Sequence, residues 1–523
     1  MGQFINVGNT RFRRALDSKY VDKTQLIAAV NSTLFKEWNM SCVTRCRRFG
    51  KSMAASMLCA YYDKSCDSRE LFKGLSIAKD PSFEKHLNKY PVIFIDMSII
   101  ISRFGHDADI VDKMQKEISN ELLEAYPEVK MRDEDDLMDL ILRIANHTGE
   151  PFLMIIDEWD AICREFKKSE APMDKYITLL RRFFKGSNAP QAFIGAYITG
   201  ILPIKKYNTE SALNNFWEYT MLSPGGWERH FGFTKKEVEE LCNDSVLDFQ
   251  DLEKWYDGYR IGKERSMFNP NSVIQALVKE SCENYWGRTG AFDKVAHYIQ
   301  MNYDGLKDAV ISMLAGEKCP VKYTRFTNDP KRVDSKDDVL TMLIHLGYLS
   351  YDPDERKCYI PNLEVREEME NAIRESKWEE VVKTIDASEA LLQAVLDGDA
   401  ETVAAGIEQV HQDEVSILSY NNENSLACVI SLAFYAARNN YMQYRELPAG
   451  KGFADIVFIP WRNVDSPVLL IELKYDKSAR TAINQIKEKN YPDKLKKYVG
   501  KVLMVGINYD PDTKKHTCSI EKA

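Results

Sequence analysis

The nine residues TRCRRFGKS, from Thr44 to Ser52, combine the end of a phosphate-binding loop with an unusual beginning. A loop that surrounds phosphates normally has the pattern G-x-x-x-x-G-K-[ST]. Gly50, Lys51 and Ser52 fit this pattern, whereas Arg45 stands where the first glycine is expected. Because a residue with a Cβ atom resists positive φ, the entry to this loop must be shaped differently. The stretch therefore predicts a phosphate loop of a divergent type.

Short apolar segments surround and follow this loop. They are MSCVT (40–44), PVIFIDMS (91–98), PFLMIID (151–157) and QAFIGAYITG (191–200). Between them lie helix-like stretches, such as residues 109–125 and 135–145, whose apolar residues recur at spacings of three and four. Strands that are buried on both faces and alternate with helices indicate a mostly parallel α/β sheet. We predict a P-loop NTPase-like domain over residues 1–230.

The pattern changes after residue 230. Thr234 and Glu237 form a capping box that opens a helix, and most of residues 231–395 has a helical pattern, which we interpret as a lid region. Within it, DDVLTMLIHLGYLSYDPDERKCYIPN (337–362) predicts a helix, a strand, a turn and a second strand. That order fits two interpretations, a winged helix or an ordinary helix followed by a hairpin.

A helix pair and a second α/β module follow. The stretch LLQAVLDGDAETVAAGIEQV (391–410) predicts two helices, and because no second copy occurs at a repeat period we interpret them as a helical linker or as a lead-in to the next module. After it the pattern returns to helices and strands. We predict a separate α/β module over residues 396–523.

Two carboxylates end one of the apolar segments of the first domain, Ile155-Ile156-Asp157-Glu158. A carboxylate at the end of a strand can hold Mg²⁺, and a neighbouring glutamate can polarise an attacking water. Lys51 would then meet the β and γ phosphates, Ser52 would ligate Mg²⁺, and the amides around Gly50 would meet phosphate oxygens. The alternative is a solvated end of a strand. The two motifs in this order predict a site for ATP and Mg²⁺.

Three arginines add positive charge to the loop. Arg45, Arg47 and Arg48 are compatible with a place beside a phosphate chain, and Arg48 is our candidate for contact with the nucleotide. The alternative interpretation is a basic surface patch.

The C-terminal module carries the pattern D-x₁₆-E-x-K, formed by Asp455, Glu472 and Lys474. Residues two apart on a strand face the same side, so Glu472 and Lys474 project together. Two carboxylates can hold Mg²⁺ against a phosphodiester, while a lysine acts on water and balances charge. Glu423, on the preceding helix, is a candidate third acid. The alternative is a surface salt bridge on a strand, because E-x-K is a common pattern.

A basic segment follows the E-x-K pattern. Between Lys474 and Lys501 there are nine basic and three acidic residues, in a chain whose net charge is -9. Such a segment can contact a phosphate backbone, although a run of charge is usually a solvated helix face. The global charge excludes a protein with a basic surface throughout.

Six segments resemble one known family. They are TRCRRFGKS, YVDKTQLI (20–27), IIDEWD (155–160), ITGILPIKK (198–206), FGFT (231–234) and WYDGYR (255–260). They are similar to the bacterial AAA-ATPase-like family that is fused to a PD-(D/E)XK nuclease domain, and the resemblance covers nearly the whole chain. It implies that the loop begins with arginine, that Thr199 lies near the γ-phosphate as a sensor, and that Gln485 and Tyr491 form the motif that trails the nuclease site.

The remaining composition sets the context. The eleven cysteines include no C-x-x-C pair, which favours reduced thiols in a cytoplasmic protein and excludes an obvious zinc site. No apolar run reaches the length of a membrane span. We expect ATP and Mg²⁺ as cofactors and nucleic acid as partner, DNA in preference to RNA, and the sequence is compatible with a homo-oligomer. The leading hypothesis is an ATP-binding, metal-dependent nuclease. The alternatives are a nucleotide-switched DNA-binding protein without cleavage and a signalling ATPase that contacts protein.

Overall fold

The computed structural model describes residues 2–523 apart from 167–170, 205, 208–209, 212, 288–297, 302, 325, 327–332, 376–377, 415–422, 450–451, 462–463, 489–494 and 496–500. The chain divides into two compact units. The first comprises Met1–Arg288, Lys322–Arg356 and Pro361–Val365, and the second comprises Thr289–Val321, Lys357–Ile360 and Arg366–Ala523. Each unit is described by itself.

A five-stranded parallel sheet forms the centre of the first unit. Its strands are β1 (Met40–Thr44), β2 (Val92–Asp96), β3 (Phe152–Asp157), β4 (Phe193–Gly200) and β7 (Trp217–Tyr219). They lie in the order β2-β3-β4-β1-β7, and every pair is parallel. Strands β1 to β4 are buried along their whole length, as continuous apolar runs require. The predicted parallel α/β sheet is confirmed.

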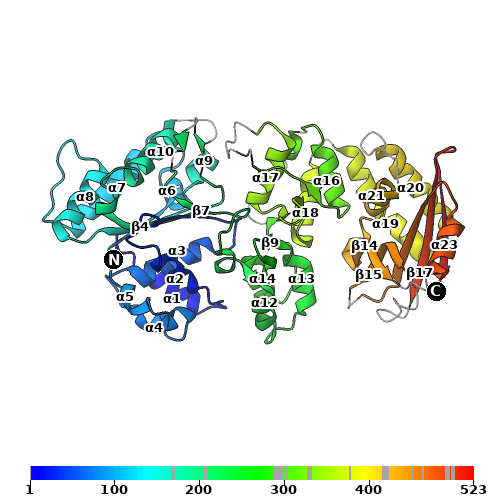
Figure 1. Ribbon diagram of the computed structural model, residues 1–523, viewed down its shortest axis with the longest axis horizontal. Helices are drawn as coiled ribbons and strands as arrows, with labels where there is room; N and C mark the ends of the chain where they lie inside the picture. The colour runs from blue at the N-terminus through cyan, green and yellow to red at the C-terminus, as the bar shows by residue number, and fades with distance from the viewer. Residues whose placement is uncertain are drawn as a thin grey trace. The chain divides into compact units, whose positions relative to one another are not determined.

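Helices cover both faces of this sheet (Figure 1). One face carries α1 (Thr10–Leu16), α2 (Gln25–Asn31), α3 (Lys51–Tyr62), α4 (Arg69–Phe72), the 3₁₀ helix η1 (Ser76–Lys79) and α5 (Phe83–His86). The other face carries α6 (Met97–Phe104), α7 (Ile110–Ala125), α8 (Leu137–Thr148), α9 (Ala161–Glu165), α10 (Ala171–Phe184) and α11 (Ala189–Ala192). Each set of helices packs its apolar residues against the strands in a separate core.

The first unit continues beyond the parallel sheet with short elements. They are β5 (Lys206–Tyr207), β6 (Glu210–Ser211), η2 (Glu228–His230), β8 (Phe233–Thr234), α12 (Lys235–Cys242), α13 (Phe249–Tyr256), β9 (Tyr259–Ile261), β10 (Glu264–Phe268), α14 (Pro270–Lys279), α17 (Lys336–Leu346) and β12 (Ser350–Asp352). Strands β8, β10 and β9 form a small antiparallel sheet. The predicted capping box is present, because Thr234 and Glu237 each accept a hydrogen bond from the other's backbone amide.

The elements expected over residues 337–362 occur in the predicted order. Helix α17 is followed by β12, a turn, and β13 (Lys357–Tyr359). The winged-helix interpretation of this segment stays a prediction.

A five-stranded mixed sheet forms the centre of the second unit. Its strands are β14 (Tyr441–Ala449), β15 (Gly452–Pro460), β16 (Val468–Tyr475), β17 (Val502–Asp510) and β18 (Lys515–Lys522), in that order. Only β16 and β17 run parallel among these neighbouring pairs. The other elements are α16 (Leu306–Leu314), β11 (Cys319–Pro320), α18 (Leu363–Arg374), whose first residues belong to the first unit, α19 (Glu379–Asp397), α20 (Ala400–Glu414), α21 (Glu423–Ala433), α22 (Ala437–Asn440) and α23 (Ala479–Glu488).

The helix pair predicted over residues 391–410 is present as α19 and α20, but it is not a linker. Val395 and Val403 are fully buried in the same core as Ile471 and Val505 of the sheet. The pair therefore belongs to the second unit, where it covers the sheet. In the part of the chain that the structure describes, no helix combines the length and the apolar character needed to cross a membrane.

Candidate functional sites

The loop between β1 and α3 places its lysine at the start of a helix. Gly50 caps α3 with a φ of 90°, a left-handed conformation that favours glycine. Lys51 is the first residue of the helix, and its Nζ donates to the carbonyl oxygen of Cys46 at 3.0 Å. The lysine is thus folded over the loop, and the half-exposed Ser52 follows it. Gly50, Lys51 and Ser52 have the arrangement that the motif predicts.

Arg45 has neither of the two roles considered for it. Its side chain is fully buried, and its Nη1 donates to the carbonyls of Thr44 at 2.9 Å and Tyr219 at 2.8 Å. The guanidinium also lies over the ring of Phe231, 5.3 Å from its centroid. Burial lowers the pKa of Arg45 to about 10, which leaves it charged at neutral pH. Arg45 holds the end of the sheet together, and it is neither a phosphate ligand nor part of a surface patch.

The left-handed backbone that the first glycine would supply lies elsewhere in the loop. Arg48 has a φ of 66°, and its Nη1 donates to the carbonyl of Tyr285 at 2.9 Å. The next residue, Phe49, is fully buried and packs edge to face against Tyr259 with the ring centroids 5.1 Å apart. Gly232 donates its amide to the carbonyl of Phe49. Later segments of the chain therefore fix the loop, through the FGFT and WYDGYR stretches.

The carboxylate of Asp157 lies at the end of β3, beside Thr199 of β4. The Thr199 hydroxyl donates to Asp157 Oδ1, which also accepts the Glu158 amide at 3.0 Å. Burial raises the pKa of Asp157, although the hydroxyls of Ser52 and Thr199 oppose the rise. Among the described residues, no donor is in hydrogen-bonding geometry with the buried Oδ2. The structure thus brings Ser52, Asp157 and Thr199 together.

Glu158 is held by residues that the sequence motifs did not single out. Its carboxylate forms an ion pair with Arg164 of α9, and Arg164 Nε donates to Asp160 Oδ2 at 2.9 Å. Asp160 also accepts the backbone amides of Ile201 and Leu202. The last aspartate of IIDEWD was the available signal for this network, but a buried arginine six residues after the glutamate has no general motif.

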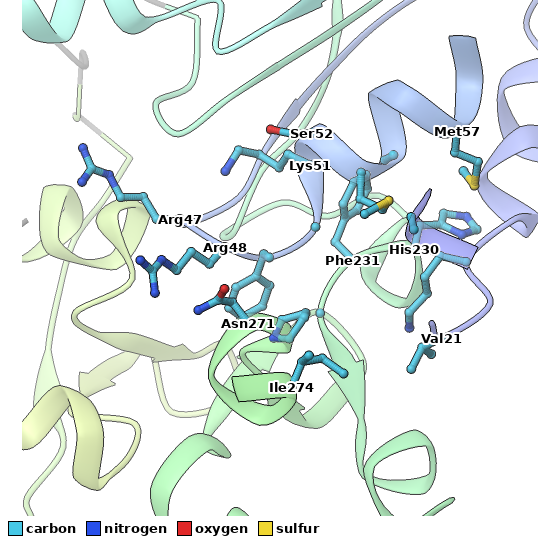
Figure 2. Close-up of a pocket in the computed structure, with 18 of the residues that line it drawn as sticks. Val21, Arg47, Arg48, Lys51, Ser52, Met57, His230, Phe231, Asn271 and Ile274 are labelled. Atoms are coloured by element: carbon cyan, nitrogen blue, oxygen red, sulfur yellow. The ribbon is translucent and has the colours of Figure 1, made fainter. Parts of the chain in front are cut away.

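Gly50, Lys51, Ser52, Glu158 and Arg164 line one cavity of about 700 Å³. Figure 2 shows that Arg47, Arg48, Lys51 and Ser52 lie toward one side, while Val21, Met57 and His230 lie toward the other. The remaining walls include the apolar side chains of Phe231, Phe233 and Ile274. Burial lowers the pKa of His230 to about 4, helped by the charges of Lys23 and Arg45, so the imidazole is neutral at pH 7. The cavity has one end with the loop cations and a more apolar end, where Lys23 also lies beside His230, and this division suits a nucleotide.

The second candidate site lies on the sheet of the second unit. The antiparallel register of β15 and β16 ends where Ile456 is opposite Ile471, and Asp455 and Glu472 are the residues next to this last pair. Asp455 is half-buried, and its Oδ2 accepts the Leu473 amide at 2.7 Å. The two acids of the D-x₁₆-E-x-K pattern are therefore neighbours.

Glu472 and Lys474 project to the same side of β16, as the two-residue spacing predicts. Lys474 Nζ lies 3.3 Å from Glu472 Oε1, and both side chains are buried, with exposed fractions of 7% and 1%. Gln485 of α23 donates its amide to the same Glu472 oxygen. Helix α23 comes this close because Gly506, opposite Glu472 on β17, has no side chain, and a Cβ atom there would lie 2.3 Å from the carbonyl oxygen of Ala479.

Some predicted site residues lie partly or wholly outside the described residues. Glu423 begins α21, as expected for the preceding helix, but its side chain is not among those described. Tyr491 and several lysines of the basic segment, at positions 489, 494, 496 and 497, also lie outside them. Among the described basic residues of that segment, Lys477, Arg480, Lys487 and Lys501 are exposed, whereas Lys474 is buried.

Both candidate sites fit Mg²⁺. Among the described residues there is no group of three or more His, Cys, Asp or Glu side chains suited to a metal ion. Mg²⁺ nevertheless commonly uses one or two carboxylates together with water and substrate phosphates. The paired acids Asp455 and Glu472 meet that requirement in the second unit. The buried Oδ2 of Asp157 beside Ser52 meets it in the first unit.

Comparison with solved structures finds low similarity. The ORC2 protein of Aeropyrum pernix in its ADPNP–ADP complexes is 11% identical with a TM-score of 0.33, and the alignment covers 69% of this chain and 98% of that one. CDC6P from Pyrobaculum aerophilum is 9% identical with a TM-score of 0.26, and covers 69% of this chain and 98% of that one. No curated protein matches the chain.

Two family models match separate parts of the chain. Residues 7–209 match the model described as a predicted AAA-ATPase, and residues 421–518 match the PD-(D/E)XK nuclease superfamily. The first match contains the loop and the acidic strand, and the second contains the D-x₁₆-E-x-K pattern. The chain therefore joins an AAA-ATPase-like domain to a domain of the PD-(D/E)XK nuclease superfamily.

Proposed function

We propose that this protein is an ATP-binding, Mg²⁺-dependent nuclease that hydrolyses phosphodiester bonds of DNA. The proposal assigns residues 1–230 to nucleotide binding, 231–395 to a lid and winged-helix region, and 396–523 to cleavage. The observation that carries it is the convergence of Asp455, Glu472, Lys474 and Gln485 on one side of the second sheet. An incidental surface salt bridge would not bury its lysine and glutamate beside a second carboxylate.

The residues of the second site divide the chemistry between them. Asp455 and Glu472 would hold Mg²⁺, and the bound ion would supply polarisation of a phosphodiester and activation of a water. Lys474 carries a positive charge next to Glu472, where it can offset the charge that develops on the phosphate. Gln485 fixes the orientation of the Glu472 carboxylate by its hydrogen bond. Glu423, at the start of α21, would supply a third carboxylate to this site.

The nucleotide part of the proposal rests on the cavity of the first unit. The loop residues Arg48, Lys51 and Ser52 line the charged end of the cavity. The backbone amides at the start of α3 add a favourable site for an anion. Asp157 and Ser52 would hold the Mg²⁺ that accompanies the phosphates. Glu158 would act on water, and Thr199, whose hydroxyl donates to Asp157, would act as a sensor near the γ-phosphate. The apolar end of the cavity suits a base.

The test is a cleavage panel with the full-length protein. Single- and double-stranded DNA and RNA of equal length are incubated with Mg²⁺ or with EDTA, each with and without ATP. We expect cleavage of DNA in Mg²⁺ and none in EDTA. ATP binding is measured separately by calorimetry, so that each half of the proposal has its own readout.

The alternative hypotheses predict different results. A nucleotide-switched DNA- or protein-binding ATPase would bind ATP and would leave every nucleic acid intact in Mg²⁺. Cleavage of RNA but not DNA would correct the substrate. DNA cleavage that persists in EDTA would refute the metal site.

A further inference from the structure

The three arginines of the loop have three different environments. Arg45 is fully buried, and its Nη1 donates to two backbone carbonyls. Arg48 donates to the carbonyl of Tyr285. Arg47 is half-buried, and no hydrogen bond or ion pair to its guanidinium is found among the described residues. Arg47 is thus the loop arginine whose donors remain available to a ligand.

Arg47 lies at the charged end of the cavity. It lines this cavity together with Lys51, Ser52 and Glu158. In Figure 2 its side chain and that of Lys51 extend to the same side of the loop, whereas Val21, Met57 and Ile274 mark other parts of the wall. A nucleotide with its base at the apolar end would bring its last phosphate toward this group of residues.

The electrostatics of Glu158 support this position. Burial raises the pKa of the Glu158 carboxyl, but the positive charges of Lys51, Arg164 and Arg47 outweigh it and the net shift is downward. Arg164 is committed to its pairs with Glu158 and Asp160. Lys51 and Arg47 are therefore the two cations near Glu158 that can turn to a phosphate.

We infer that Arg47 binds the terminal phosphate of a nucleoside triphosphate and thereby distinguishes a triphosphate from a diphosphate. The inference rests on the proposed nucleotide function of the first unit. Arg47 offers several N–H donors in a planar fork, a geometry that matches phosphate oxygens. Lys51 and the amides of α3 would bind phosphates that ATP and ADP share, whereas Arg47 would contact the group that only ATP has.

The test compares two nucleotides by calorimetry with the full-length protein in Mg²⁺. The probes are ADP and the non-hydrolysable triphosphate AMP-PNP, so that the result does not depend on hydrolysis. The variants are Arg47→Ala, Arg47→Lys, and Arg13→Ala as a matched control, because Arg13 is exposed on α1 and does not line the cavity. Thermal unfolding curves establish that each variant is folded.

Arg47→Ala should weaken AMP-PNP binding by about tenfold or more and change ADP binding by less than about twofold, the expected result of losing charge-assisted hydrogen bonds to one phosphate. Arg47→Lys keeps the positive charge but loses the planar fork of N–H donors. Its affinity for AMP-PNP should therefore lie between those of the native protein and of Arg47→Ala. Equal losses for both nucleotides, or unchanged AMP-PNP affinity, would overturn the inference and leave the proposed function standing. Absence of binding of either nucleotide by the native protein would overturn both.

Discussion

Glu158, which directly follows β3, forms an ion pair with Arg164 that holds its carboxylate in place. The side chain of Arg164 is only 6% exposed, and its Nε donates to the buried Asp160. Asp160 in turn accepts two backbone amides that follow β4. The network links the ends of two strands, and it holds the carboxylate of Glu158 in place at the cavity.

Replacing Arg164 should destabilise the first unit. Arg164→Ala leaves two carboxylates without their cation, and removal of one member of a buried ion pair costs about 3–5 kcal/mol. Arg182→Ala is the matched control, because Arg182 pairs with Asp136 and Asp139 at an exposed site. It should change the free energy of unfolding by less than about 1 kcal/mol. Denaturant unfolding measures both, and similar small effects would show that the network is not structural.

Replacement of Arg45 and replacement of Arg47 should change the free energy of unfolding by different amounts, although the two residues are close in the sequence. Arg45→Ala removes a fully buried guanidinium from the carbonyls of Thr44 and Tyr219. The unsatisfied carbonyls and the lost packing should reduce the free energy of unfolding by about 3 kcal/mol. Arg47→Ala should change it by less than about 0.5 kcal/mol, as is usual for partly exposed positions. A reversed order in urea denaturation would contradict our placement of both side chains.

Lys51 and Glu158 should affect different steps at the nucleotide. Lys51→Ala should weaken ATP binding, because it removes the cation at the start of α3. Glu158→Gln should bind ATP and hydrolyse it more slowly, because the amide cannot act as a base. Calorimetry measures the affinity and phosphate release measures the rate. Unchanged affinity in Lys51→Ala would refute the phosphate loop.

Glu364 should make the stability of the first unit depend on pH near neutrality. Its carboxyl is buried and accepts the amides of Tyr285 and Trp286, and burial raises its pKa from 4.5 to about 7. Between these values the folded state keeps a proton that the unfolded state releases, so stability falls as pH rises through that window. The total loss is at most about 3 kcal/mol.

The Glu364→Gln variant provides the comparison, because glutamine has a similar shape and does not ionise. Its free energy of unfolding, relative to that of the native protein, should rise between pH 5 and pH 7.5. Within the window between the two pKa values the rise should be about 1.4 kcal/mol for each pH unit. A difference between the two proteins that stays constant over this range would rule out a neutral, buried Glu364.

The sequence predicted the parallel sheet because its strands carry continuous apolar runs. MSCVT became β1 and the FLMIID part of PFLMIID became β3, and every residue of the two strands is buried. Capping also follows from local chemistry, and the pair Thr234 and Glu237 closed as expected. At the second site, the two-residue spacing of Glu472 and Lys474 was enough to place both on one side of a strand.

Other features depend on contacts that are distant in the sequence. The charge of Arg45 was compatible with a place beside a phosphate chain or in a surface patch, but the side chain instead donates to the carbonyl of Tyr219 and lies over the ring of Phe231. Likewise, periodicity alone could not show that the helices over residues 391–410 cover a sheet whose first strand begins only at Tyr441. The local sequence pattern predicts a helix or a strand, whereas contacts distant in the sequence determine what that element packs against.

The central claim is that Asp455 and Glu472 share a catalytic metal. Because Glu472 is buried beside Lys474, its replacement by alanine would leave a buried lysine without its carboxylate. The isosteric variants Asp455→Asn and Glu472→Gln limit this cost, because they keep the size of each side chain and an oxygen that accepts a hydrogen bond while they remove the charge. Asp512→Asn is the control, because Asp512 is exposed in the turn between β17 and β18.

The most direct measurement is the rate of Mg²⁺-dependent DNA cleavage by these variants, with DNA binding measured in parallel. Asp455→Asn and Glu472→Gln should each lose more than about 100-fold in cleavage and should still bind DNA, because Mg²⁺ tolerates the loss of a ligand poorly. Lys474→Ala should reduce the rate through loss of a charge that does not hold the ion, by about 10²-fold or more. Asp512→Asn should cleave at the native rate. Native cleavage rates in both Asp455→Asn and Glu472→Gln would contradict the nuclease site.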